Sequence, residues 1–457
     1  MSSSGGARAG WLRHVPIVSG FLELDKPPRT FLYFMAFNVV SWQCLAGSAL
    51  VLFARHVDMP ATWVGLLISF MPLTVSLVAV TVSLVERVGP KRLLMTTWLL
   101  RNLCALSLFA MPWAIGRWGS HAGWYILIGA TLAFCVARAM GTGGWWPWLH
   151  ELIPAEQRGT YFSTEAGVSQ ASTIFVAVSI GLILGRTPVL GDFLTVSGMG
   201  IAVGLISVAW IALIPGGRRI VGHRTAPGGM ASYRKALANR DFLHFTVQGA
   251  LGLAFMTWFG AAAILYLRDE LLLTSKEIMF TTAFGGLGVA ITVRFWGRYA
   301  DAVSSAQAMF LALSGHSAVV LSWLTLVPGS TWAQWAAAPL LILAMIFGAA
   351  FVMATNRGAL AHVRDDGRVG YTNIWVVVSS VCMGLTAILV GQVVGRWDMG
   401  GFQACFLVSG FGGLVCAVAS LWVREQGHVP PEDVRDILQP SLPLRTLAQI
   451  VWITAGL

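Results

Sequence analysis

Charge is what this sequence has least of. Asp, Glu, Lys and Arg make up 11% of its 457 residues, whereas soluble proteins carry roughly 25%. Apolar residues make up 56% of the chain, and the mean hydropathy is +0.72. These values exclude an ordinary soluble globular protein. They predict a polytopic membrane protein. Only helices and closed barrels satisfy their backbone hydrogen bonds in lipid, and apolar stretches of helical length, described below, predict an all-α fold.

The sequence motifs of common enzymes and metal sites are also missing. There is no His-Glu-x-x-His pair, no Gly-x-Ser-x-Gly turn and no Walker phosphate loop. The six cysteines lack Cys-x-x-Cys spacing and lie in apolar stretches, which favours small buried side chains over a disulfide framework or a zinc site. We therefore expect no enzyme, no metal and no cofactor. Because no nucleotide site is indicated, any energy-requiring activity of this chain would have to be driven by an ion or solute gradient.

The apolar residues fall into twelve stretches, each long enough to cross a hydrocarbon layer of about 30 Å as a helix. A basic segment with Gly and Pro clusters, 216–240, follows the sixth stretch and predicts a cytoplasmic linker. We expect a cytoplasmic segment 1–29, six-helix bundles at 30–215 and 241–424, and a cytoplasmic tail 425–457 with a short amphipathic helix. The predicted spans are 30–54, 61–84, 93–116, 122–148, 160–185, 192–214, 241–266, 276–297, 306–327, 333–356, 369–394 and 400–423.

Lysine and arginine are distributed unevenly between the predicted loops. Of the 30 such residues, 22 lie on the side that holds the N-terminus and 6 on the opposite side. Since cytoplasmic loops carry the excess of Lys and Arg, both termini are predicted in the cytoplasm. Lysine is scarce and arginine abundant, which suggests a bacterial genome, so the inner (plasma) membrane of a bacterium is the expected location. Topology then accounts for the net charge of +10, and no nucleic-acid partner is expected. The expected partner is the lipid bilayer, and the chain is expected to act as a monomer.

The two halves of the chain repeat short motifs at one period. The sequence RTFLYF at 29–34 opens the first span, and RDFLHF at 240–245 opens the seventh, 211 residues later. Residues 156–161 and 366–371 both follow the pattern acid-x-Arg-x-x-Tyr, 210 residues apart. Chance matches of short motifs would not agree on one period. The agreement predicts two copies of a six-helix unit in the same orientation.

The loops after the second and eighth spans each carry an acidic residue near a glycine and a basic residue. Both resemble the signature of the major facilitator superfamily, roughly Gly-x-x-x-Asp-Arg-x-Gly-Arg-Lys/Arg. The resemblance extends over the chain from 29 to 424 and implies two pseudo-symmetric bundles that rock around a midplane site. It also implies a cytoplasmic gate; the alternative is that these are loop charges that fix topology. The predicted gate residues are Glu86, Arg87, Gly89, Arg158, Gly297, Asp301 and Arg368.

Glu165, Arg138 and Arg101 lie within the apolar sequence of predicted spans. An unpaired charge there costs about 2.5–3.5 kcal/mol on insertion scales, so we expect Glu165 to pair with Arg138 or Arg101. Arg138 resembles the fourth-helix arginine of proton-linked family members. In the functional interpretation, Glu165 takes up and releases a proton while an arginine holds an anionic group or the carboxylate. The alternative is a static ion pair.

Polar residues at helical spacing mark faces that could line a cavity. Each of them is also consistent with a hydrogen bond between helices. Tryptophans near span ends, including Trp113, Trp118 and the cluster around Trp148, are predicted to be interfacial anchors. The predicted substrate and proton pathway consists of Arg138, Glu165, Arg101, Asn38, Trp42, Gln43, Ser169, Gln248, Trp258 and Asn373.

The resemblance implies a secondary active transporter that moves a small organic solute by alternating access. An anionic solute and proton coupling are the options that the charged residues raise. A second hypothesis is a non-transporting membrane scaffold or assembly factor with the same fold. Locking the two bundles with a disulfide separates the hypotheses, because a scaffold would keep its function when locked.

Overall fold

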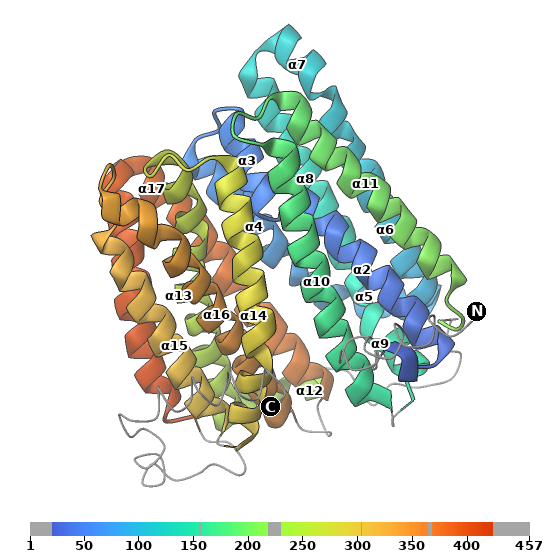
Figure 1. Ribbon diagram of the computed structural model, residues 1–457. Coiled ribbons are helices and arrows are strands. Elements are labelled where there is room, and N and C mark those ends of the chain that lie inside the picture. The colour runs from blue at the N-terminus through green and yellow to red at the C-terminus, as the bar shows by residue number, and fades with distance from the viewer. Residues whose placement is uncertain (1–20, 155–156, 218–229, 303, 364–367, 424–457) are drawn as a thin grey trace, which may run out of the picture. The chain divides into compact units, whose positions relative to one another are not determined.

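Helices account for nearly all of the chain that the computed structural model describes, which is residues 21–154, 157–217, 230–302, 304–363 and 368–423 (Figure 1). No strand is formed in this described part. The contacts divide the chain into two compact units, residues 1–223 with Leu273–Ala283, and 224–272 with 284–457. The predicted tail helix and residues 218–229 of the predicted linker lie outside the described residues.

The first unit holds the helices before the linker, and the second unit holds those after it, except that the start of α14 groups with the first unit. The helices of the first unit are α2 (Lys26–Ala46), α3 (Ser48–His56), α4 (Ala61–Val75), α5 (Val78–Val88), α6 (Pro90–Ala105), α7 (Met111–Trp118), α8 (Ser120–Thr142), α9 (Trp145–Leu152), α10 (Arg158–Leu184) and α11 (Leu190–Leu213), with a 3-10 turn η2 (Leu106–Ala110). Those that follow are α12 (Met230–Ala238), α13 (Arg240–Asp269), α14 (Ser275–Ala302), α15 (Ser305–Ser322), η4 (Trp323–Thr325), α16 (Thr331–His362) and α17 (Arg368–Ser420).

Ten helical segments in the described part of the chain are long and apolar enough to cross a membrane. The last of them, Gly370–Ser420, contains the non-helical residue Asp398 (φ 43°) and covers two predicted spans. The predicted span 61–84 corresponds to α4 and α5, each of which is too short to cross alone. All twelve predicted stretches are therefore helical, and the predicted all-α membrane fold is confirmed.

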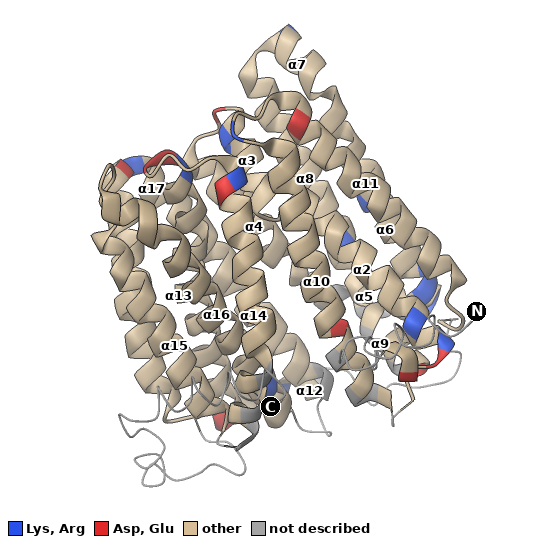
Figure 2. Cartoon of the chain, in the orientation of Figure 1, with Lys and Arg blue, Asp and Glu red and all other residues tan. Residues whose placement is uncertain are grey.

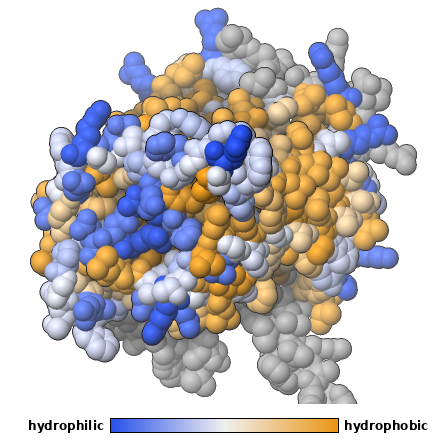
Figure 3. All heavy atoms as spheres, turned by 90° about the horizontal axis from the view of Figure 1, so that it is seen from above, coloured by the Kyte–Doolittle hydropathy of each residue, from blue (hydrophilic) through white to orange (hydrophobic). Residues whose placement is uncertain are grey.

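The helix surfaces match a bilayer. Charged residues gather at helix ends and are sparse along the helices (Figure 2). Viewed end-on, polar residues cluster on the end face, with apolar residues exposed beside them (Figure 3). Phe175 and Leu182, seven residues apart on one face of α10, are both mostly exposed. Such a face is unfavourable in water and favourable against lipid tails.

The first unit has an aromatic core around Phe31 on α2. Its ring lies 5.1 Å from that of Trp145, 5.8 Å from that of Trp148 and 6.4 Å from that of Tyr161. Aromatic pairs of this kind contribute about 0.5–1.5 kcal/mol each beyond the area that they bury. Trp148 is fully buried in this core. The predicted anchor role is therefore wrong for Trp148, because its ring packs against helices and not against the membrane interface.

A lysine caps the carboxyl end of α11. The Lys91 Nζ, on the first turn of α6, donates to the carbonyl oxygens of Ala212 at 3.0 Å and Ile214 at 2.5 Å. The backbone N–H of Lys91 donates to the Gly217 carbonyl at 3.2 Å. The last carbonyls of a helix have no partner within the helix, and a cation there also opposes the negative end of the helix dipole. Lys91 therefore stabilises the carboxyl end of α11.

The residues after α11 are held from α9 as well. The Glu151 carboxylate accepts from the Gly217 N–H at 3.1 and 3.2 Å, and Trp148 Nε1 donates to the Pro215 carbonyl at 3.3 Å. Gly217 has a φ of 64°, a left-handed conformation that favours glycine. The beginning of the predicted linker is thus fastened to the first unit by side chains of α6 and α9.

We expect Lys91→Met to lower the free energy of unfolding by about 1–2 kcal/mol, because it removes two charge-assisted hydrogen bonds and the favourable interaction with the helix dipole. Thermal unfolding of the purified protein in detergent measures the change. Arg92→Met is the matched control, since Arg92 is the exposed basic neighbour of Lys91. Equal destabilisation by both variants would show that the cap contributes nothing.

Candidate functional site

A polar cluster is buried in the first unit between α2 and α6. Asn38 lies on α2, and Trp98 and Arg101 lie on α6, three residues apart and therefore on one face of that helix. Trp98 Nε1 and Arg101 Nη2 both donate to Asn38 Oδ1, each at 2.9 Å. Arg101 is 0% exposed and Asn38 is 8% exposed. The structure thus brings together two of the predicted site residues, Asn38 and Arg101, and adds Trp98.

The Arg101 guanidinium is held mainly by aromatic rings. Its central carbon lies 4.6 Å from the ring centre of Trp98 and 5.1 Å from that of Phe134 on α8. Desolvated cation–π contacts contribute about 2 kcal/mol or more. Two further donors of Arg101, Nε and Nη1, are buried without a hydrogen-bond partner in the described structure. Arg101 is therefore a buried cation whose hydrogen-bonding capacity is only partly used.

Arg138 lies on α8, and its side chain is half-buried. It is close enough to Arg101 for the two guanidinium groups to repel each other. The Cys135 thiol, three residues before Arg138 on the same helix, lies near both arginines. Neither arginine pairs with a carboxylate among the described residues. The predicted ion pair with Glu165 is therefore not formed, and the described residues of the first unit provide no counter-charge for these two neighbouring cations.

Glu165 lies on α10, and its side chain is half-buried. In the described part of the chain it has no charged partner. Ser169, one turn further along the same face, is also half-buried, and its carbonyl accepts from Thr173 Oγ1 at 2.9 Å. Tyr161, one turn before Glu165, is fully buried with its hydroxyl group unpaired among the described residues. The side chains of Glu165 and Ser169, the two predicted pathway residues on α10, are therefore both partly accessible.

The other predicted pathway residues on α2 are half-buried. Trp42 lies one turn after Asn38, and Gln43 follows it. The Gln43 side chain lies along its own helix beside Gly47. A Cβ atom added at Gly47 would be only 2.5 Å from Gln43 Oε1. Gly47 separates α2 from α3. Gln43 thus fills the space left by the glycine at the break between these helices.

In the second unit, two predicted pathway residues make hydrogen bonds between helices. Gln248 on α13 donates through Nε2 to the Cys416 carbonyl on α17. Asn373 on α17 donates through Nδ2 to the Tyr233 hydroxyl on α12 at 2.8 Å. Trp258, on α13, is half-buried. Gln248 and Asn373 therefore serve in helix packing in this structure.

The predicted gate is described only in part. Gly89 has a φ of 91°, so the loop after α5 uses a conformation that favours glycine. The Arg87 side chain is exposed, and Gly297 on α14 is half-buried. The gate thus stays a prediction, because its remaining side chains, those of Glu86, Arg158, Asp301 and Arg368, lie outside the described structure.

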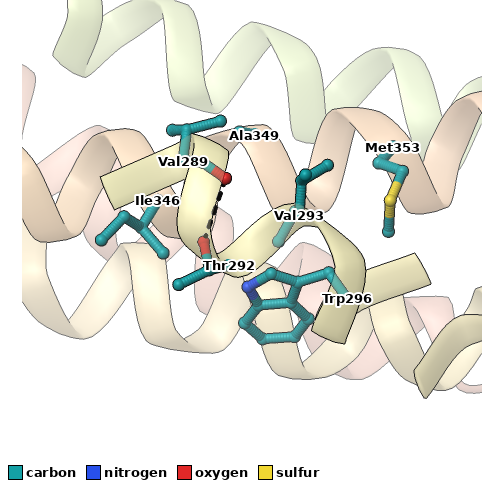
Figure 4. Close-up of a pocket in the computed structure, with 8 residues that line it drawn as sticks. Val289, Thr292, Val293, Trp296, Ile346, Ala349 and Met353 are labelled. Carbon is teal, nitrogen blue, oxygen red and sulfur yellow. Dashed lines mark hydrogen bonds between the residues drawn. The ribbon is translucent and has the colours of Figure 1, made fainter. Parts of the chain in front are cut away.

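A small crevice in the second unit lies between α14 and α16, with an empty volume of about 160 Å³. Its lining is apolar apart from Thr292, and Val293, Trp296 and Met353 are among the residues that form it (Figure 4). The Thr292 hydroxyl donates to the Gly288 carbonyl of its own helix at 2.9 Å. The polar atoms of the lining are thus limited to the Thr292 hydroxyl and the Trp296 indole N–H. Among the described residues, no three His, Cys, Asp or Glu side chains are grouped so as to hold a metal ion.

Sequence reasoning missed Trp98 and Phe134, the two rings that enclose Arg101. For Trp98 a signal existed, because its position three residues before Arg101 places both side chains on one face of a helix. For Phe134 no local signal existed, since its contact depends on how α8 packs against α6.

Comparison with known proteins identifies the fold. No family model and no curated protein matches the sequence. Among solved structures, the chain is similar to a D-xylose–proton symporter, with a TM-score of 0.68 at 13% identity over 87% of this chain and 98% of that one. It is also similar to the inward-open xylose transporter XylE from E. coli, with a TM-score of 0.65 at 12% identity over 87% and 96% of the two chains. The nucleoside transporter NupG matches with a TM-score of 0.62 at 13% identity over 86% and 97%.

Proposed function

We propose that this chain, whose fold is that of the major facilitator transporters, is a secondary active transporter of a small anionic solute. The observation that carries the proposal is the pair of neighbouring cations in the first unit, Arg101 and Arg138, which have no carboxylate beside them among the residues that the structure describes. A charge inside a membrane-spanning bundle is costly and usually functional. A substrate anion that binds at the more accessible of the two, Arg138, would supply the missing counter-charge.

Proton coupling forms the second part of the proposal. Glu165 is a half-buried carboxyl group without a charged partner in the described structure. An ionised carboxylate is unfavourable in apolar surroundings, and binding a proton removes that cost. Transport would then follow from two bundles that alternately expose a shared site. The D-xylose–proton symporter among the similar structures is consistent with such coupling.

A ligand screen tests the anion site. The purified protein is heated with a panel of carboxylates, sugar acids, sugar phosphates, nucleosides and neutral sugars. We expect anions to raise the unfolding midpoint, because a ligand at 100 times its Kd stabilises the folded state by about 2.7 kcal/mol. Arg138→Ala should abolish the shift, whereas Arg117→Ala, which removes an exposed arginine on α7, should preserve it. A shift with neutral compounds alone, or one that survives in Arg138→Ala, would contradict the proposal.

A further inference from the structure

The orientation of the Asn38 amide is fixed by its two partners. Trp98 Nε1 is a donor only, and so is every nitrogen of an arginine side chain. Both groups point at the same atom of Asn38 from 2.9 Å. The reversed amide would place its NH₂ group against two donors, which is repulsive. The hydrogen-bond network therefore determines that Oδ1 faces α6 and that Nδ2 faces away from these two donors.

The Asn38 Nδ2 is left as an available donor. In the described part of the chain it has no hydrogen-bond partner, and it is not among the fully buried polar atoms that lack one. The small exposed area of Asn38, 8% of the residue, therefore includes its amide nitrogen. The Asn38 amide can therefore offer a solute two N–H groups. Its oxygen is not available as an acceptor, because Trp98 and Arg101 already donate to it.

Arg101, in contrast, is not available to a solute. It has no exposed surface, and the Trp98 and Phe134 rings lie against its guanidinium. Its one hydrogen bond to another side chain goes to Asn38. Its influence on a bound molecule would therefore pass through Asn38 and through the positive potential that it shares with Arg138.

We propose that Asn38 determines substrate specificity by donating a hydrogen bond to an acceptor oxygen of the solute, and that Trp98 and Arg101 are positioning residues that hold its amide for this purpose. This inference rests on the proposed function, in which Arg138 binds the anionic group. It narrows the substrate class to oxygenated anions, such as hydroxy acids and sugar acids. Plain fatty acids of the same length lack the acceptor and leave the Asn38 donor unpaired.

The test compares anions in pairs of equal carbon number that differ in hydroxylation: lactate with propionate, 3-hydroxybutyrate with butyrate, and gluconate with hexanoate. Dissociation constants are measured on the purified full-length protein. A site that hydrogen-bonds a substrate oxygen discriminates against the analogue without it. We expect the wild-type protein to bind at least one hydroxylated member about fivefold or more tightly than its partner, the contribution of one hydrogen bond.

Asn38→Asp is the decisive variant. Its carboxylate still accepts from Trp98 and Arg101 and adds an opposite charge beside the guanidinium, so folding should be preserved. Its second oxygen replaces the donor, so we expect the preference for the hydroxylated anion to be lost. Trp98→Phe keeps the ring but lacks the N–H, and Arg101→Lys keeps the charge but lacks the guanidinium geometry. Both should reduce the preference by about twofold to fivefold, because the amide is then held by one partner fewer.

Asn102→Ala is the matched control. Asn102 is a buried asparagine of the same helix whose amide donates to the Trp98 carbonyl at 2.8 Å, so its removal should leave the preference unchanged. Equal binding of both members of every pair by the wild-type protein overturns the inference, and so does an unchanged preference in Asn38→Asp or, where that variant does not fold, in Trp98→Phe. Either result would overturn only the role of Asn38 and would not contradict the proposed anion site at Arg138. Absence of binding by every anion overturns the proposed function as well.

Discussion

Replacing Glu165 with glutamine should abolish accumulation driven by a pH gradient while leaving membrane insertion and substrate binding intact. Glutamine has nearly the same shape as protonated glutamate, so the packing of α10 should be unchanged. It carries no proton that can be released, so substrate movement would no longer be linked to proton movement. The half-buried position of Glu165, without a charged partner in the described structure, is the basis of this expectation.

Proteoliposomes provide the measurement. Accumulation of a ligand found in the screen is followed with an imposed pH gradient, and exchange of labelled for unlabelled ligand is followed at equal pH. We expect Glu165→Gln to lose accumulation and to retain exchange, because exchange needs only the alternation of the loaded protein. Ser179→Ala, on the same helix and outside the predicted pathway, is the control that should retain both. Normal accumulation by Glu165→Gln would rule out its role as the proton carrier.

The sequence predicted the fold because the relevant signals are local. A run of about 20 apolar residues specifies a membrane helix wherever it packs, so all twelve stretches appear as helices. The internal period near 210 residues, visible in segments such as 29–34 and 240–245, indicated two related halves. The match to solved transporters confirms the predicted major facilitator fold.

The partners of the charged residues could not be predicted in the same way. The rise of 1.5 Å per residue gives the height of Glu165 and Arg138 in the membrane, but not the direction in which each side chain points. The structure directs Arg101 towards Asn38 and two aromatic rings, and no ion pair with Glu165 forms. Contacts of this kind depend on the rotation of each helix about its axis, which neighbouring helices determine.

The misassigned tryptophan has a similar cause. A tryptophan near the end of a span is usually an interfacial anchor, and Trp148 satisfies that pattern. It is nevertheless buried, because the chain turns at Gly143–Gly144 between α8 and α9 and brings Trp148 against Phe31. Position along the sequence places a residue at a depth in the membrane, whereas burial depends on what lies beside it.

The largest loss of stability should follow from Gly204→Val. Gly204 lies on α11 where that helix packs against α2 and α6. A Cβ atom at this position would overlap Asn102 Oδ1 on α6 and would lie 2.6 Å from Ser41 Oγ on α2. Gly200, one turn earlier, makes a similar approach, with its added Cβ atom 2.6 Å from Cys44 Cβ. Small residues four apart allow the backbones of membrane helices to approach closely.

A branched side chain at position 204 would force α11 away from both neighbours. Overpacking a core costs typically about 1–3 kcal/mol and occasionally more, and here two buried polar groups would also be displaced. We expect little or no monodisperse protein from Gly204→Val on size-exclusion chromatography in detergent. Gly204→Ala should lie between it and the wild-type protein, with a lowered unfolding midpoint.

Gly191→Val is the matched control, because Gly191 lies on the same helix and a Cβ atom there would meet nothing within 4 Å. Wild-type yield and stability for Gly204→Val would show that α11 does not need this close approach. The approach also bears on the candidate site, since Ser41 lies about one turn after Asn38 on α2 and Asn102 directly follows Arg101 on α6. Gly204→Ala protein that still folds should therefore also lose part of its preference for hydroxylated anions, because a displaced α2 or α6 no longer aligns Asn38 Oδ1 with its two donors.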